Sequence, residues 1–133
     1  MAAHILIIED NEASLDLVRY LLQHHGYTTV EAIDGESGID RASTDRPDLV
    51  LCDLQLPGID GFGVLRAIRE RSELEALAVV AVTALSMPSD RDAVLAAGFN
   101  GYLAKPIDPE TFVTEVEAFL RPELRVRSHA ANN

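Results

Sequence analysis

Residues 47–61 read Pro-Asp-Leu-Val-Leu-Cys-Asp-Leu-Gln-Leu-Pro-Gly-Ile-Asp-Gly. The run at residues 49–52 is apolar throughout and lacks the polar alternation of a half-exposed strand. Such a run is typical of a strand that is buried on both faces of a parallel sheet. The run ends at Asp53, so the stretch predicts a buried strand that carries a carboxylate at its carboxyl end.

Similar short runs alternate with helical patterns along the rest of the chain. The expected strands are residues 5–8, 28–31, 49–52, 79–82 and 101–104, and the polar composition of residues 28–31 is typical of an edge strand. The expected helices lie at about residues 13–25, 35–43, 62–71 and 88–97, with a last one that is capped by Asp108 and has Pro109 at its first helical position. Five strand–helix repeats predict an α/β fold, a doubly wound five-stranded parallel sheet with five helices.

Ligands of doubly wound sheets bind outside the carboxyl ends of the strands. The residues that directly follow the expected strands are Glu9, Asp10, Asp53, Thr83 and Lys105. Three carboxylates in one crevice repel one another unless positive charge lies beside them. Lys105 and one divalent cation would balance the three charges, and carboxylate ligands in an open site suit Mg²⁺.

This set of residues defines the chemistry that the site could perform. In-line attack by Asp53 on a phosphoryl group would form an acyl phosphate. Mg²⁺ and Lys105 would stabilise the negative charge of the phosphoryl oxygens. The hydroxyl of Thr83 could then donate to the bound group, and its movement would report that the group has arrived.

Four segments carry a resemblance to a known family. They are Ile-Leu-Ile-Ile-Glu-Asp-Asn at 5–11, the stretch at 47–61, Ala-Val-Thr-Ala at 81–84 and Gly-Tyr-Leu-Ala-Lys-Pro-Ile at 101–107. Together and in this order they resemble the receiver domain of bacterial two-component response regulators, which has a flavodoxin-like fold of five β–α repeats. We expect residues 1–120 to form this domain and residues 121–133 to form a short disordered tail. Because so short a tail cannot form a DNA-binding domain, the chain resembles the single-domain regulators of chemotaxis and the cell cycle.

The resemblance implies a role for each acidic residue of the rim. It implies that Asp53 is the phosphoacceptor and that Mg²⁺ binds directly to Asp10, Asp53 and the main-chain carbonyl of Gln55. Glu9 is expected to reach the metal through water. Gln55 and Leu85 match positions that help to set the rate at which the phosphoryl group hydrolyses.

The resemblance also implies a switch. Thr83 and Lys105 match the hydroxyl and the ammonium that bind the phosphoryl group, and the small Ala84 should leave access to the phosphoacceptor open. Tyr102 matches the aromatic residue that turns inward when the hydroxyl moves. The bond before Pro106 matches a cis peptide bond, which is rare outside X-Pro pairs.

The implied partners are proteins. The phosphoryl donor would be a histidine kinase or a histidine phosphotransfer protein, and a downstream target would bind to the fourth helix, fifth strand and fifth helix. The chain would not be an enzyme beyond its own phosphorylation and dephosphorylation. Its net charge of −11 disfavours direct binding to nucleic acid, and no apolar run is long enough to span a membrane. A single cysteine excludes an internal disulfide and fits the reducing cytoplasm.

Other functions fit the residues less well. A hydrolase of the haloacid-dehalogenase type needs a second Asp two residues after the nucleophile, where this chain has Gln55. A flavodoxin-type carrier needs a hydroxyl- and glycine-rich loop after the first strand, whereas Glu-Asp-Asn-Glu at 9–12 would repel a phosphate. A phosphorylation-independent, receiver-like interaction module remains the alternative, although the intact set of Asp53, Thr83 and Lys105 argues against it.

Overall fold

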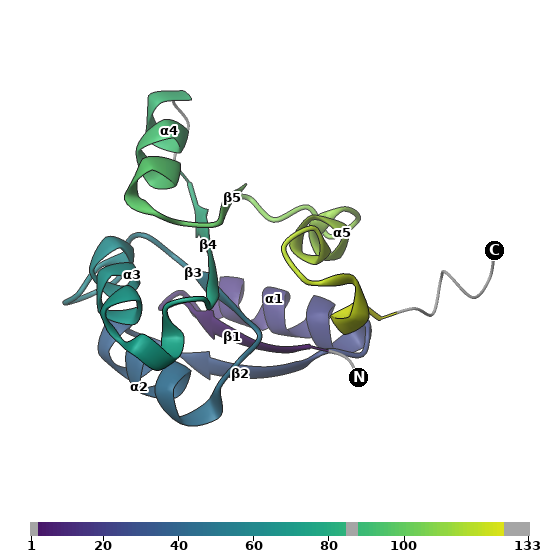
Figure 1. Cartoon of the computed structure of the whole chain (residues 1–133). Helices are drawn as coiled ribbons and strands as arrows, with labels where there is room; N and C mark the ends of the chain where they lie inside the picture. The colour runs from purple at the N-terminus through teal and green to yellow at the C-terminus, as the bar shows by residue number, and fades with distance from the viewer. Residues whose placement is uncertain (1–2, 85–87, 127–133) are drawn as a thin grey trace.

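A computed structural model describes residues 3–84 and 88–126 of the chain (Figure 1). Leu85 and residues 127–133 of the expected tail lie outside the described residues. Five parallel strands form one sheet in the order β2-β1-β3-β4-β5, so the polar strand β2 lies at an edge, as expected. The strands are β1 (His4–Ile8), β2 (Thr28–Ala32), β3 (Leu49–Cys52), β4 (Ala78–Thr83) and β5 (Gly101–Ala104).

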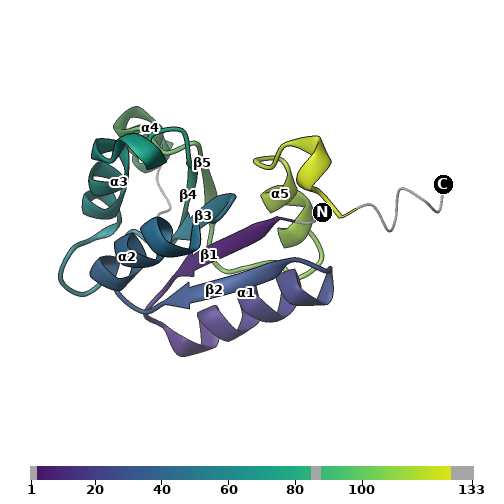
Figure 2. The same ribbon diagram turned by 60° about the horizontal axis from the view of Figure 1, so that its bottom comes forward.

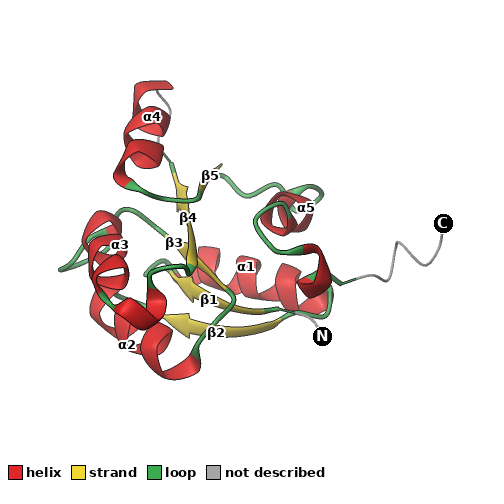
Figure 3. Ribbon diagram, in the orientation of Figure 1, coloured by secondary structure: helices red, strands yellow, loops and turns green. Residues whose placement is uncertain are grey.

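A helix follows each strand along the chain (Figure 3). The helices are α1 (Glu12–His24), α2 (Gly35–Asp45), α3 (Gly61–Glu70), α4 (Pro88–Ala97) and α5 (Phe112–Glu117), with short 3₁₀ turns η1 (Ser72–Leu74) and η2 (Pro122–Leu124). The predicted fold of five strands and five helices is therefore confirmed.

The sheet is covered on both faces, because successive side chains of a strand point to opposite sides. In β1, Ile5 and Ile7 belong to the core that α1 and α5 cover, while Leu6 and Ile8 belong to the core beneath α2, α3 and α4. Figure 2 shows β1 and β2 between α2 on one side and α1 on the other. Burial on both faces explains why the strands read as continuous apolar runs.

Side-chain caps begin the first three helices near the carboxyl ends of the strands. An oxygen of Asn11 accepts from the N–H of Ser14 at 2.9 Å and starts α1. Asp34 starts α2 and Asp60 starts α3 in the same way. Each cap accepts a hydrogen bond from an N–H of the first turn that has no partner inside the helix. These residues therefore mark the point at which the loop ends and the helix begins.

The last helix begins later than the sequence indicates. We expected Asp108 as its cap and Pro109 at its first position, whereas α5 begins at Phe112. The carboxylate of Asp108 accepts from the N–H of Glu110 at 3.0 Å, and its carbonyl accepts from the N–H of Phe112 at 2.9 Å. Asp108 and Pro109 therefore belong to a separate turn that precedes α5, and they do not form its first helical turn.

Part of the expected tail also differs from the prediction, because residues 121–126 pack against the body of the domain. The N–H of Ala3 donates to the carbonyl of Leu124 at 3.0 Å, which ties η2 to the start of β1. The side chains of Leu124 and Val126 pack against the core on the α1 and α5 side. These two apolar residues account for the order of the segment.

No helix among residues 3–84 and 88–126 combines the length and the hydropathy needed to cross a membrane.

Tyr27 holds three separate parts of the chain together. Its side chain is 2% exposed, its hydroxyl donates to the carboxylate of Glu117 in α5, and the same oxygen accepts from the N–H of Val126 at 2.9 Å. Burial, followed by the hydrogen bond to Glu117, raises the pKa of Tyr27 to about 12. The hydroxyl is therefore protonated at neutral pH and can serve both partners.

We expect Tyr27→Phe to lower the free energy of unfolding by about 1–3 kcal/mol, because two partners inside the fold lose their hydrogen bond. Since the folded pKa lies above the unfolded value of 10.0, this contribution is full below pH 10 and is lost as the pH rises toward 12. Urea unfolding at neutral pH measures the difference. Tyr20, which is 61% exposed, provides the control: Tyr20→Phe should change stability by less than about 0.5 kcal/mol. Equal effects of the two substitutions would contradict this role of Tyr27.

Candidate functional site

The pairing of β1 with β3 aligns the ends of these two strands. Ile8, the last residue of β1, lies beside Cys52, the last residue of β3. The N–H of Asp53 donates to the carbonyl of Ile8 at 3.0 Å, so the ladder continues one residue beyond the strands. Glu9 and Asp53 therefore leave the sheet side by side.

Lys105 reaches these residues from the far edge of the sheet. Thr83 pairs with Ala104, and the N–H of Lys105 donates to the carbonyl of Thr83 at 2.8 Å. The ammonium of Lys105 then lies 2.7 Å from Oε1 of Glu9 and 3.0 Å from Oδ2 of Asp53. One cation thus joins residues that are separated by 96 and 52 positions in the sequence.

Burial makes this pairing of charges strong. Glu9 is 4% exposed and Asp53 is 7% exposed. Burial raises the pKa of Glu9, and the hydrogen bonds from Lys105 and from the N–H of Asn11 only partly offset this effect. Burial alone would lower the pKa of Lys105, but the hydrogen bonds and negative charges of Glu9 and Asp53 outweigh it and raise that pKa. Lys105 therefore stays charged at neutral pH.

The backbone around Asp53 fixes the direction of its carboxylate. Oδ1 accepts from the N–H of Gln55 at 3.0 Å, while Oδ2 faces Lys105. The chain then doubles back, since the N–H of Gly61 donates to the carbonyl of Leu54 at 2.9 Å. A Cβ atom at Gly61 would lie 2.7 Å from the carbonyl oxygen of Asp53, so only glycine lets α3 start this close to the backbone of Asp53.

Asp10 completes a cluster of three carboxylates. One oxygen each from Glu9, Asp10 and Asp53 lies within 4.8 Å of the others, and Asp10 is the exposed member. Oxygen donors around an opening to solvent match the preference of Mg²⁺, which binds through few carboxylates and keeps several waters. The donor set that the sequence predicted therefore fits this metal.

The remaining predicted residues lie on β4 and β5 or directly after these strands. Thr83 is 1% exposed at the end of β4, and Ala84 beside it is exposed. Tyr102 lies next to Ala81 across the β4–β5 pair and packs partly against the core beneath α3 and α4. The peptide bond between Lys105 and Pro106 is cis.

Two backbone contributions to the site were not predicted from the sequence. The N–H of Gln55 binds Asp53, although only the carbonyl of Gln55 was expected to take part. The N–H of Asn11 donates to Oε2 of Glu9 at 3.1 Å, while the Asn11 side chain caps α1. Both contacts join a carboxylate to the N–H two residues later. For Asp53 this is the local turn that aspartate side chains favour, so that contact could have been anticipated.

Comparisons with known proteins place this chain in a family. Residues 5–117 match the response regulator receiver domain. The chain is 35% identical over 120 residues to the polar-differentiation response regulator DivK of Brucella anthropi, a match that covers 90% of this chain and 98% of the relative. The corresponding protein of Brucella melitensis is 34% identical over the same length.

Solved structures show the same fold. The chemotaxis response regulator CheY4 of Vibrio cholerae superposes with a TM-score of 0.85 at 28% identity, over 90% of this chain and all of that one. The receiver domain of a sensor histidine kinase from Pseudomonas aeruginosa, solved with a magnesium ion coordinated in its active-site cleft, has a TM-score of 0.81 at 30% identity, over 90% of this chain and 98% of that one. The fold, the carboxylate rim and these matches together identify the chain as a member of the response regulator receiver domain family.

Proposed function

We propose that this chain is a single-domain response regulator that accepts a phosphoryl group on Asp53, with Mg²⁺ bound beside it. The observation that carries the proposal is the position of the Lys105 ammonium at the carboxyl ends of the strands. Its Nζ atom lies 2.7 Å from Oε1 of Glu9 and 3.0 Å from Oδ2 of Asp53. A cation in this place can neutralise the charge that a phosphoryl group would bring. We further propose that residues 1–120 make up the receiver domain and that the protein works in the cytoplasm.

In the proposed transfer, an oxygen of Asp53 attacks the phosphorus atom of a phosphohistidine in line with the P–N bond. The new P–O bond forms as the P–N bond breaks, and the donor imidazole keeps the electron pair. The N–H of Gln55 and the ammonium of Lys105 hold the Asp53 carboxylate in one orientation before the attack. Mg²⁺, when bound, would supply further positive charge for the phosphoryl oxygens.

The proposed metal ligands are Asp10, Asp53 and the main-chain carbonyl of Gln55, with Glu9 acting through water. Both carboxylate oxygens of Glu9 already accept hydrogen bonds, from Lys105 and from the N–H of Asn11. The same holds for Asp53, so the indirect contact proposed for Glu9 rests on the resemblance to the family and not on these hydrogen bonds. The exposure of Asp10 supports a direct one, because a metal entering from solvent meets it first.

The proposed partners are a histidine kinase or histidine phosphotransfer protein as the donor, and a protein target on the face formed by α4, β5 and α5. We propose that the hydroxyl of Thr83 moves to the new phosphoryl group and that Tyr102 turns toward the space it leaves. Thr83 and Tyr102 lie on adjacent strands, so the first movement can alter the packing of the second. Exposed Ala84 leaves room for the incoming donor.

Mg²⁺ should stabilise the folded protein, because the metal binds only where the three carboxylates converge. At a concentration ~100 times the dissociation constant, the gain is about 2.7 kcal/mol. Asp10→Asn should reduce this gain, and Asp16→Asn on α1 is the control that removes an exposed carboxylate outside the cluster. Thermal unfolding with and without MgCl₂ at constant ionic strength measures the effect. A wild-type melting temperature that ignores millimolar Mg²⁺ would show that the metal site is wrong.

Asp53→Asn should abolish phosphoryl uptake, because the amide keeps the shape of the side chain but is not a nucleophile. Incubation with acetyl phosphate and Mg²⁺, followed by intact mass and peptide mapping, should find one phosphoryl group on wild type and none on the variant. Asp60→Asn is the matched control, since Asp60 caps α3 near the same loop and should leave uptake intact. A wild-type protein that takes up no phosphoryl group would favour the phosphorylation-independent module instead.

The proposed switch predicts that a variant can accept a phosphoryl group without the structural change at α4 and β5. Thr83→Ala should still accept a phosphoryl group, while beryllofluoride with Mg²⁺ should shift backbone NMR signals only around the pocket. In wild type the shifts should extend to β5 and to residues 88–97 of α4, because a ligand moves only an equilibrium whose two states it binds differently. Thr83→Ser keeps the hydroxyl and should behave as wild type. Wild-type shifts confined to the pocket would refute the switch and leave phosphoacceptance standing.

A further inference from the structure

Residues 121–126 form a C-terminal strap that runs from the turn after α5 to the start of the sheet (Figure 2). The carbonyl of Leu124 accepts from the N–H of Ala3 at 3.0 Å, directly before β1. The guanidinium of Arg125 donates to the carbonyl of Leu120, from Nε at 3.1 Å and from Nη2 at 2.9 Å. Basic side chains near the end of a helix satisfy free carbonyls in this way. The strap therefore joins the turn that follows α5 to the first strand.

A second contact of the strap reaches α5 itself through Tyr27. The N–H of Val126 donates to the Tyr27 hydroxyl at 2.9 Å, and that hydroxyl donates to Glu117, the last residue of α5. The helix has only six residues, and an isolated helix of this length is not stable in water. Its position is therefore set by its buried apolar side chains and, at its end, by the strap and Tyr27.

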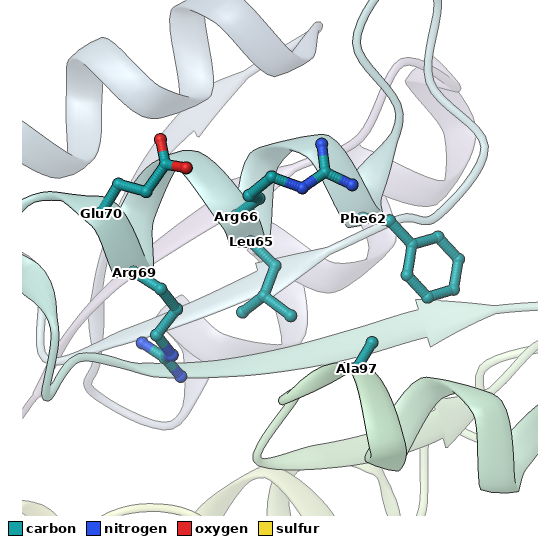
Figure 4. A pocket seen from close by; sticks show the side chains of 6 residues that line it. All are labelled: Phe62, Leu65, Arg66, Arg69, Glu70 and Ala97. Atoms are coloured by element: carbon teal, nitrogen blue, oxygen red, sulfur yellow. The ribbon is translucent and has the colours of Figure 1, made fainter.

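Helix α4, on the other side of β5, is held by fewer contacts (Figure 1). Among residues 89–97, Val94 alone is buried, and Leu95 is 41% exposed. A groove of about 280 Å³ lies between α3 and the end of α4 (Figure 4). Its lining residues are Phe62, Leu65, Arg66, Arg69, Glu70 and Ala97. A helix that buries so little apolar surface belongs to the part of a fold that can move at a low cost in free energy.

We propose that the C-terminal strap is a latch that keeps α5 in place when a phosphoryl group arrives, so that α4 and β5 move against a fixed α5. The inference rests on the proposed phosphorylation of Asp53 and adds how far the response spreads. A phosphoryl group shifts the elements whose alternative positions cost least, and these are on the α4 side. The proposed target face then has one fixed side and one movable side. Release of the strap lets the change spread into α5.

Hydrogen exchange of the full chain, followed by NMR, tests the latch without any phosphoryl mimic. Arg125→Ala removes both donors to Leu120, so the amides of residues 115–120 should exchange at least about tenfold faster than in wild type. Arg121→Ala is the matched control, because Arg121 is 74% exposed and forms its ion pair with Glu123 inside the strap. Unchanged exchange in Arg125→Ala, or an equal acceleration of the β3 amides, would overturn the latch.

A second variant removes the other contact. Val126→Pro deletes the N–H that donates to Tyr27, and Arg125 before it has φ −83° and ψ 145°, an extended conformation that a following proline accepts. The same amides should exchange faster in this variant. Val126→Ile keeps the N–H and should exchange as wild type does, and equal acceleration in both variants would contradict the role of this hydrogen bond.

Beryllofluoride with Mg²⁺ tests whether the latch confines the response. In wild type the NMR shifts should reach β5 and α4 but not residues 115–120, whereas in Arg125→Ala they should extend into residues 115–120. Shifts of these residues that are as large in wild type as in Arg125→Ala would overturn the proposal. A wild-type protein that does not respond to beryllofluoride would contradict the phosphoacceptor proposal instead, and faster exchange in Arg125→Ala would still show that the strap holds α5.

Discussion

The arrangement of the site depends on the ion pairs of Lys105 with Glu9 and Asp53. Two carboxylates that are nearly excluded from solvent need a cation at hydrogen-bonding distance, because burial penalises each unpaired charge by several kcal/mol. The cation comes from β5, at the opposite edge of the sheet from β2. The site therefore forms only when β1, β3, β4 and β5 pair in this register. A shift of one strand against its neighbour would move Lys105 away from the two carboxylates.

The site combines a carboxylate that is held in place, Asp53, with a carboxylate that is accessible to solvent, Asp10. Asp53 is held from two directions, by the N–H of Gln55 and by Lys105, and Gly61 brings the start of α3 against its backbone. Asp10, by contrast, is exposed. A fixed carboxylate suits a nucleophile, which gains from preorganisation, while an accessible carboxylate suits a ligand of a metal that arrives from solvent with its waters.

Helix α4 takes part in two different surfaces. One side faces α3 across a groove, and the helix also contacts β5, which carries Tyr102 and directly precedes Lys105. Because α4 follows the strand that ends at Thr83, a change at Asp53, the proposed phosphoacceptor, can reach either surface through the same element. The Arg69 contacts with Leu77 and Asn100 tie α3 to the segments before β4 and β5, so the groove has a fixed wall on the α3 side.

The sequence by itself determined the order of elements and the identity of the rim residues. Apolar runs mark strands buried on both faces, and ligand-binding residues of such sheets follow the strands directly, so Glu9, Asp53 and Lys105 could be found without coordinates. The predicted start of α5 was wrong, because the same capping pattern also fits an isolated turn. The packing of residues 121–126 was not predicted, because the sequence does not show which core residues Leu124 and Val126 contact. Only the tertiary structure decided the bridging of two carboxylates by one ammonium, the contact of Tyr27 with Glu117 and the groove beside Arg66. Each depends on distances between segments far apart in the chain, which local residue patterns do not encode.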